Sequence, residues 1–274
     1  MSDNSPSVEI DQSKPSIARV YDYVLGGKDN YPVDQAIGDH FIHNLPGSVA
    51  IAKTNRDVLV RAVRELAADG IRQFVDLGSG LPTSDNVHQV AARHAAGAKV
   101  VYVDNDPIVL AHGRAILATD ANTVVIQADA VDPEGIRNHP DLVRLIDFDQ
   151  PVAVIFSAIL HHLEDRENPL GIVRFWRDRV APGSALFISH FRSGDNAETR
   201  EAEGKLQETF GRGRWRTDEE IAAFFEGLDI AEPGIVPAVQ WRPDATGGAE
   251  AIGTAERELT VWERLIVAGL GYKR

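Results

Sequence analysis

The sequence predicts an α/β fold built on a mostly parallel sheet. Short apolar segments rich in β-branched residues alternate with helical segments from residue 73 onward, and buried strands separated by helices form parallel sheets. A glycine-containing turn follows the first of these strands, and an acidic residue ends each of the first three. A chain of 274 residues with 43% hydrophobic content can bury the core of one large domain with additions.

Three parts are expected along the chain. Residues 1–14 are polar and are expected to be a disordered tail. Residues 15–70 are expected to form a helical cap, with one helix after a Ser16 cap, a short one along Val33, Ile37 and Phe41, and a longer one over 48–68. Residues 71–274 are then the sheet domain, with a helical insert at about 192–226.

The sheet domain shows regular alternation. Strands are expected at 73–77, 99–103, 123–127, 152–156 and 184–190, with two last strands at 234–241 and 265–272. Helices are expected at 84–96, with Thr83 or Ser84 as cap, at 107–117 and at 169–180, with an ambiguous stretch near 141–146. The run Thr217-Asp-Glu-Glu220 predicts a capping box that opens a further helix.

The composition of the chain restricts the classes of function and partner to be considered. The net charge of -13 disfavours a nucleic-acid partner, because an acidic surface repels phosphate. The chain has no cysteine, which excludes disulfides, thiolate metal sites and a thiol nucleophile. No stretch approaches the roughly 18 apolar residues of a membrane span, and the polar N-terminus lacks a signal-peptide core. We therefore expect a cytoplasmic protein without a membrane partner.

The sharpest motif is the turn Asp76-Leu-Gly-Ser-Gly80. Glycines there allow a ligand to approach the backbone, and the next helix points its N–H groups at the same place. Asp104 ends the second strand and Asp129 follows the third, so three carboxylates are expected along the carboxyl edge of the sheet, where ligands bind in such folds. The alternatives are a tight turn without a ligand and three solvated loop acids.

The turn also indicates which nucleoside ligand fits. Dinucleotide sites have a third glycine where this chain has Thr83, and Pro82 has no N–H to offer a pyrophosphate. Asp76 would repel phosphate but would suit an ammonium group. S-adenosylmethionine has a ribose, an adenine and an amino-acid end, and it has no phosphate.

These motifs resemble those of known families. The Asp76–Gly80 run, Asp104 and the Asp129-Ala130 pair resemble the cofactor motifs of class I methyltransferases. Residues 15–34 and the Asn55-Arg56 pair are similar to the S-adenosyl methyltransferase family, long catalogued as a domain of unknown function. The resemblance extends from Pro15 to the C-terminal strand. It implies a Rossmann-like sheet of seven strands with the last strand antiparallel, an S-adenosylmethionine site and no established acceptor.

At the methionine end of the cofactor, the resemblance implies contacts from the first strand and the turn. Asp76 would face the amino-acid portion. Gly78, Ser79 and Gly80 would pass beneath the cofactor. Ser157, after the fourth strand, resembles the position whose backbone faces the methionine portion.

At the nucleoside end, the resemblance implies contacts from the second and third strands. Asp104 would hold the ribose hydroxyls, and Asn105 would lie against adenine, where the class often has an apolar side chain. Asp129 would accept from the adenine amino group while the Ala130 N–H contacts the ring.

The N-terminal part offers further candidates. The loop at 26–31 contains two glycines, Asn30 and Tyr31 and could close over the sulfonium, with Tyr31 or Tyr21 giving an aromatic face to the cation. Arg56 could pair with the methionine carboxylate. A plain loop between helices and a surface salt bridge are the alternatives.

Two adjacent histidines follow the fourth strand. His161 and His162 lie where the acceptor sits in this fold, so either could take a proton from a hydroxyl or amine. Their Leu-His-His-Leu context resembles many small-molecule class I methyltransferases, in which it is often structural. Adjacent positions point apart, so no metal site is predicted. No Asn/Asp-Pro-Pro-Tyr/Phe run follows the strand, which disfavours methylation of nucleic-acid amino groups.

The sequence therefore predicts an S-adenosylmethionine-dependent methyltransferase with S-adenosylhomocysteine as product and a small molecule as acceptor. A non-catalytic binder of S-adenosylmethionine or S-adenosylhomocysteine is the first alternative, and a nicotinamide dehydrogenase is the second. The acceptor and the oligomeric state do not follow from the sequence.

Overall fold

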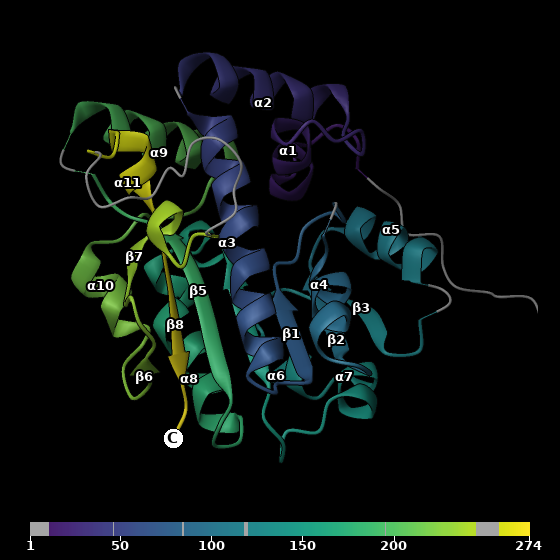
Figure 1. Ribbon diagram of the computed structural model, residues 1–274. Helices are drawn as coiled ribbons and strands as arrows, with labels where there is room; N and C mark the ends of the chain where they lie inside the picture. Colours follow the sequence, from purple (N-terminus) through teal and green to yellow (C-terminus); the bar gives the residue numbers. More distant parts are fainter. Residues whose placement is uncertain (1–10, 46, 84, 118–119, 195, 245–257) are drawn as a thin grey trace, which may run out of the picture.

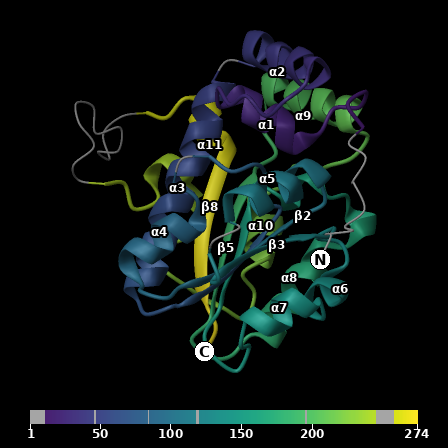
Figure 2. The ribbon, with the colours of Figure 1, turned by 90° about the vertical axis from the view of Figure 1, so that its right-hand side faces the viewer.

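The computed structural model describes residues 11–45, 47–83, 85–117, 120–194, 196–244 and 258–274. A central sheet carries helices on both faces, and α1, α2 and α9 lie together beyond one end of it (Figure 1). The view in Figure 2 shows α3 and α4 on one side of the sheet and α6, α7 and α8 on the other. No helix in the described ranges is both long enough and apolar enough to cross a membrane.

The strands run in the order β3-β2-β1-β4-β5-β8-β6, with β7 paired to β8. The first five strands pair in parallel. Their bounds are β1 Gln73–Leu77, β2 Lys99–Asp104, β3 Thr123–Gln127, β4 Ala153–Ser157 and β5 Ala185–Phe191. Strand β8 (Ile266–Tyr272) runs antiparallel beside β5 and carries the short strands β6 (Asp229–Ile230) and β7 (Val236–Pro237). Because the strand order reverses between β1 and β4, a crevice is expected outside their carboxyl ends.

The helices fall into three groups by position. The N-terminal helices are α1 Ile17–Val24, α2 Pro32–Asn44 and α3 Ser48–Ala68. The helices between parallel strands are α4 Val87–His94, α5 Pro107–Leu117, α6 Pro133–Arg137, α7 Pro140–Leu145 and α8 Pro169–Arg179. The helices after β5 are α9 Ala197–Phe210, α10 Asp218–Ala223 and α11 Val261–Leu265.

Two apolar clusters fill the spaces on the two faces of the sheet. Val58, Leu66 and Phe74 are fully buried in the cluster under α3 and α4. Trp176 and Phe156 are fully buried in the cluster under α8. Strands buried on both faces explain why the sequence of each is almost continuously apolar.

The predicted fold class is confirmed, and most element bounds agree with prediction to within one residue or two. The capping box at Thr217 is present. The sheet has eight strands in the described part of the chain instead of the predicted seven, because β6 and β7 are two-residue pairings that carry little sequence signal. Residues 1–10 of the expected tail lie outside the described residues.

Three local predictions were wrong. Helix α4 starts at Val87 after an Asn86 cap, and Thr83 is not the cap; Ser84 lies outside the described residues. Ser16 is the N-cap residue of α1, but its side chain does not bond to the helix as expected and its hydroxyl donates to Asp106 instead. The expected strand over 234–241 shortens to β7 and a 3₁₀ turn, Ala238–Gln240. The buried Arg61 guanidinium explains that turn, because it donates to the carbonyls of Ala238 and Trp241 at 2.8 and 3.0 Å.

A buried polar cluster attaches the N-terminal helices to the sheet. The Asp34 carboxylate is fully buried and accepts from the Ser16 N–H, the Arg19 Nε and the Tyr31 N–H, each at 2.9 Å. The other side of Arg19 faces Asp106, beyond β2, at 3.9 Å, and the Ser16 hydroxyl donates to the same Asp106. We call Ser16, Arg19, Asp34 and Asp106 the clamp, because they hold α1 and α2 against the end of β2.

Removing Asp34 should therefore destabilise the protein strongly. In Asp34→Ala, the buried Arg19 charge loses its closest partner, and we expect the free energy of unfolding to fall by about 3–5 kcal/mol. Asp39→Ala on the same helix is the matched control, since it removes only an exposed bond from the Tyr23 hydroxyl and should change little. Urea unfolding measures both; equal effects would show that the clamp is unimportant for stability.

Candidate active site

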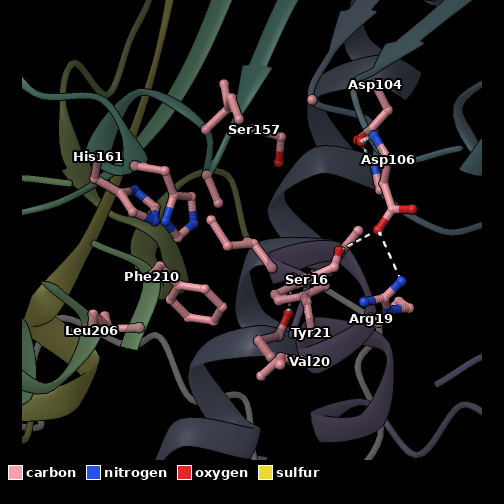
Figure 3. Close-up of a pocket in the computed structure, with 18 of the residues that line it drawn as sticks. Ser16, Arg19, Val20, Tyr21, Asp104, Asp106, Ser157, His161, Leu206 and Phe210 are labelled. Carbon is pink, nitrogen blue, oxygen red and sulfur yellow. Dashed lines mark hydrogen bonds and ion pairs between the residues drawn. The ribbon is translucent and has the colours of Figure 1, made fainter. Parts of the chain in front are cut away.

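A cavity of about 610 Å³ opens between the N-terminal helices, the carboxyl ends of the strands and the segment from α9 to α10. Sites for small molecules measure roughly 300–1,000 Å³. Figure 3 shows its two ends, with Asp104, Asp106 and Arg19 on one side and His161, Leu206 and Phe210 on the other. Ser157 and Tyr21 lie between them. We call the first the carboxylate end and the second the aromatic end.

The turn after β1 forms the floor of the carboxylate end. Gly78 has a φ of 71° and Gly80 a φ of 66°, a conformation that favours glycine. The Gly78 N–H donates to the Val103 carbonyl at 2.8 Å, which fixes the turn to β2. A Cβ at Gly78 would lie 2.6 Å from the Ile159 side chain, whereas one at Gly80 would meet nothing within 4 Å. The turn thus presents bare backbone to the cavity.

Two buried polar atoms beside this turn have no hydrogen-bond partner in the described part of the chain. They are Oδ1 of Asp76 and the hydroxyl of Ser79, and both residues line the cavity. Burial raises the pKa of Asp76 to about 7; the Arg56 guanidinium lowers it and the nearby Asp104 raises it further. Unsatisfied buried polar atoms cost about 1–3 kcal/mol each, so the site is arranged for a ligand that donates hydrogen bonds.

Asp104 is held firmly at the end of β2. Its carboxylate accepts from the Gly80 N–H at 2.8 Å and from the Asp106 N–H at 2.9 Å. Burial raises its pKa to about 6, although these two N–H groups act in the opposite direction. The Asn105 amide donates to Asp129 at 3.3 Å, so its side chain turns toward the end of β3. The end of β2 is thus joined to the glycine turn, the clamp and β3.

A chain of neutral hydrogen bonds occupies the middle of the cavity. The Asn55 amide donates to the Tyr21 hydroxyl at 3.2 Å and to the Ser157 hydroxyl at 3.3 Å, and its oxygen accepts from Ser189 at 2.6 Å. Tyr21 in turn donates to the Ala52 carbonyl at 2.9 Å. Asn55 therefore fixes side chains from α1, β4 and β5 around the junction of the two ends.

The two histidines differ in their surroundings. His161 is buried, stacks on Phe191 with a centroid distance of 4.2 Å, and accepts from the Phe191 N–H at 3.3 Å. His162 is half-buried, and its ring makes no hydrogen bond to the described residues. Burial lowers the pKa of His162 to about 4 and that of His161 well below its usual value. Both rings are therefore neutral at pH 7, and only that of His162 is available to accept a proton.

The other walls of the aromatic end are apolar and come from segments far apart in the chain. Phe191 packs edge-to-face on Trp215 at 5.1 Å, which extends the stack begun by His161. The remaining apolar lining includes Phe41, Leu45, Ile51, Leu206, Phe210 and Leu265.

Most of the predicted site residues line this cavity. These are Tyr21, Arg56, Asp76, Gly78, Ser79, Gly80, Asp104, Asn105, Asp129, Ala130, Ser157, His161 and His162. Their individual roles remain predictions.

Asn30 and Tyr31 are not among the lining residues. The Asn30 amide donates to Asp22 at 2.8 Å, and Tyr31 packs near Leu81 with the Arg19 guanidinium 5.3 Å above its ring.

Sequence reasoning did not identify Asp106 or Phe210. Asp106 is one residue beyond the Asp104-Asn105 motif, whereas nothing local marks Phe210.

Comparison with known proteins gives one consistent result. The family model described as S-adenosyl methyltransferase matches residues 3–274. A candidate methyltransferase from Thermobifida fusca YX has 45% identity and a TM-score of 0.89 over 96% of this chain and 97% of its own. A DUF574 family protein from Streptomyces avermitilis MA-4680 has 36% identity and a TM-score of 0.88, covering 97% and 100%. No curated protein matches the chain.

A more distant structure shares the fold alone. The N-methyltransferase NodS from Bradyrhizobium japonicum WM9, in complex with S-adenosyl-L-homocysteine, has 10% identity and a TM-score of 0.51. The alignment covers 93% of this chain and 98% of NodS.

The glycine turn permits a sharp stability test. Gly78→Ala should cost about 1–2 kcal/mol for an alanine in the left-handed region and a further amount for the contact with Ile159. Gly97→Ala is the matched control, because Gly97 has a φ of 72° and open space around the Cβ position. We expect a larger loss of unfolding free energy for Gly78→Ala in urea titrations. A loss no greater than that of Gly97→Ala would mean that Ile159 moves aside freely.

Proposed function

The chain belongs to the S-adenosyl methyltransferase family, whose cofactor is S-adenosylmethionine, and we propose that it transfers the methyl group to a small molecule bound at the aromatic end of the cavity. One observation carries this proposal. The carboxylate end, the neutral junction and the aromatic end form one continuous cavity, so a donor and an acceptor can meet inside it. The alternative interpretation of the sequence, a nicotinamide dehydrogenase, gains no support from membership of this family.

The donor set of the carboxylate end fits this cofactor. Asp76 and Ser79 offer two unpaired buried oxygens to the ammonium group, and Arg56 offers a positive charge to the carboxylate. For the ribose hydroxyls, we propose Asp104 as the acceptor, since it lines the cavity at the end of β2. For the adenine, we propose the set named from the sequence, which is Asn105, Asp129 and Ala130.

The protein's own part in the reaction is mainly positioning. When bound, the cofactor supplies a methyl group that a sulfonium already activates. Helices α1, α2, α3 and α9 wall the cavity and limit the access of water, and the Asn55 hydrogen bonds fix the junction where donor and acceptor meet. His162 is the proposed proton acceptor, because its ring is neutral and free. His161 is the proposed positioning residue, because its ring is stacked and bonded.

A direct experiment tests the proposal against a non-catalytic binder. The purified protein is incubated with S-adenosylmethionine labelled in the methyl group and the low-molecular-mass fraction of a cell extract. We expect the label in a small molecule and an equal amount of S-adenosylhomocysteine. Tight binding of the cofactor with no labelled product from any extract would favour a regulatory binder.

The raised pKa values predict how cofactor binding depends on pH. Burial raises the pKa of Asp76 to about 7 and that of Asp104 to about 6, and the ionised forms, present above these values, are those that bind ammonium and hydroxyl donors. Affinity should therefore rise with pH from about 5.5 to 7.5, by up to tenfold per unit below each pKa. Isothermal titration with S-adenosylhomocysteine measures the trend.

Asp76→Asn provides the control for that trend. It should remove most of the dependence near pH 7 and weaken binding about 10- to 100-fold at pH 7.5, as expected for the loss of a charge-assisted hydrogen bond. Affinity of the unmodified protein that is flat across this range would contradict the assignment of Asp76.

The proton-acceptor role of His162 predicts a separation between catalysis and binding. His162→Ala should lower kcat by about 10²–10⁴-fold, the usual contribution of a general base, while the Kd for S-adenosylhomocysteine changes less than about twofold. The kcat of the unmodified protein should show no histidine titration above about pH 5, because burial lowers the pKa of His162 to about 4. His94→Ala, on the exposed end of α4, is the control. An unchanged kcat in His162→Ala would exclude this role.

A further inference from the structure

We infer that the methyl acceptor is an uncharged, planar aromatic compound and that its nucleophile is a hydroxyl group. The inference rests on the proposed function and specifies the acceptor for the same site. It follows from the shape of the aromatic end and from the charges of the residues that line it.

The aromatic end has a wall of rings that pack on one another. His162 lies beside His161 at a centroid distance of 4.4 Å, His161 stacks on Phe191, and Phe191 packs edge-to-face on Trp215. Phe210 lines the same end from α9, and Figure 3 shows it on the same side of the cavity as His161. Flat apolar ligands gain both burial and ring contacts in such a pocket.

Charge is divided unevenly between the two ends of the cavity. The carboxylates that line it are Asp11, Asp76, Asp104, Asp106 and Asp129, from the N-terminal segment and the ends of β1 to β3. In the described part of the chain, the aromatic end has no lining carboxylate, and its charged lining residue is Arg212. An ammonium acceptor would lie beside the sulfonium with no carboxylate among the described lining residues to balance its charge, which is unfavourable away from bulk water.

An anionic acceptor is also disfavoured. The Arg212 guanidinium pairs with Glu167 at 2.7 Å, and its Nε donates to the His162 carbonyl at 3.1 Å. Its charge is therefore already balanced, and part of its donor capacity is used to hold the histidine backbone. A neutral acceptor needs no opposite charge from the residues of this lining.

The neutral ring of His162 matches a hydroxyl nucleophile. The acceptor oxygen forms a bond to the methyl carbon as the bond from carbon to sulfur breaks and its electron pair stays on sulfur. The O–H bond breaks and the proton moves to the free ring nitrogen of His162. The products are an aryl methyl ether, S-adenosylhomocysteine and a histidinium that later releases its proton to solvent.

Three matched compounds test the inference. The unmodified protein, saturated with S-adenosylhomocysteine, is titrated with 2-naphthol, 2-naphthylmethylamine and 2-naphthoate, which share one ring system and differ in charge at pH 7. We expect 2-naphthol to bind at least about tenfold more tightly than either charged compound, because each of those must bury an uncompensated charge. With S-adenosylmethionine, 2-naphthol should give 2-methoxynaphthalene, detected by mass spectrometry.

Two phenylalanine variants test whether 2-naphthol binds at the aromatic end. Phe210→Ala should weaken 2-naphthol binding roughly 3- to 10-fold, the range expected for a lost ring contact, and leave the affinity for S-adenosylhomocysteine unchanged. Phe175→Ala, on α8 and outside the cavity lining, is the matched control.

Each outcome is decisive. Equal or tighter binding of the amine or the carboxylate, or their methylation in place of the naphthol, overturns the acceptor class and leaves the methyltransferase proposal intact. Failure of the protein–S-adenosylhomocysteine complex to bind 2-naphthol also overturns it. Failure to bind S-adenosylhomocysteine at all refutes the proposed function itself, and the inference with it.

Discussion

The buried Arg19 charge, held between Asp34 and Asp106, is the constraint on which the site depends. A buried ion pair is costly unless further hydrogen bonds satisfy it, and here Asp34 also accepts two backbone N–H groups while Arg19 donates to the Lys14 carbonyl. The Asp106 N–H donates to Asp104, so the same cluster orients the carboxylate proposed for the ribose. Closure of the cavity and the shape of its carboxylate end are therefore set by one group of contacts.

Burial has opposite electrostatic consequences at the two ends of the cavity, and both serve a cationic donor. It raises the pKa of Asp76 and Asp104 and lowers the pKa of His161 and His162, since desolvation favours the neutral form of each. The carboxylates are thus partly protonated near neutral pH and can ionise when a positive ligand arrives. The histidines stay neutral beside a sulfonium, where a protonated ring would repel it.

Sequence patterns predicted the sheet and the turn because their signals are local. The strands are short apolar segments, and the glycines and acids of the site directly follow them in the chain. The functions of Asp106 and Asn55 could not be predicted in this way, because their partners Ser16 and Ser157 lie 90 or more residues away in the chain. Phe210 could not be predicted because it belongs to a wall assembled from several helices. The loop at 26–31 shows the same dependence on tertiary contacts: the Asp22 carboxylate accepts from the Asp29 N–H and the Asn30 amide, which no local pattern indicated.

The segment between α9 and α10 links acceptor recognition to the proposed base. Arg212 donates to the His162 carbonyl, the Arg214 N–H donates to the His161 carbonyl at 3.0 Å, and a Cβ at Gly213 would lie 3.0 Å from that same oxygen. The backbone of both histidines is therefore held by the segment that follows Phe210. A change at the end of α9 that moves this segment would also disturb the backbone that carries the two histidines. The shape of the acceptor pocket and the position of the proposed base are thus coupled through main-chain contacts. A substitution that changes the pocket must therefore leave the histidine backbone in place if proton transfer is to continue.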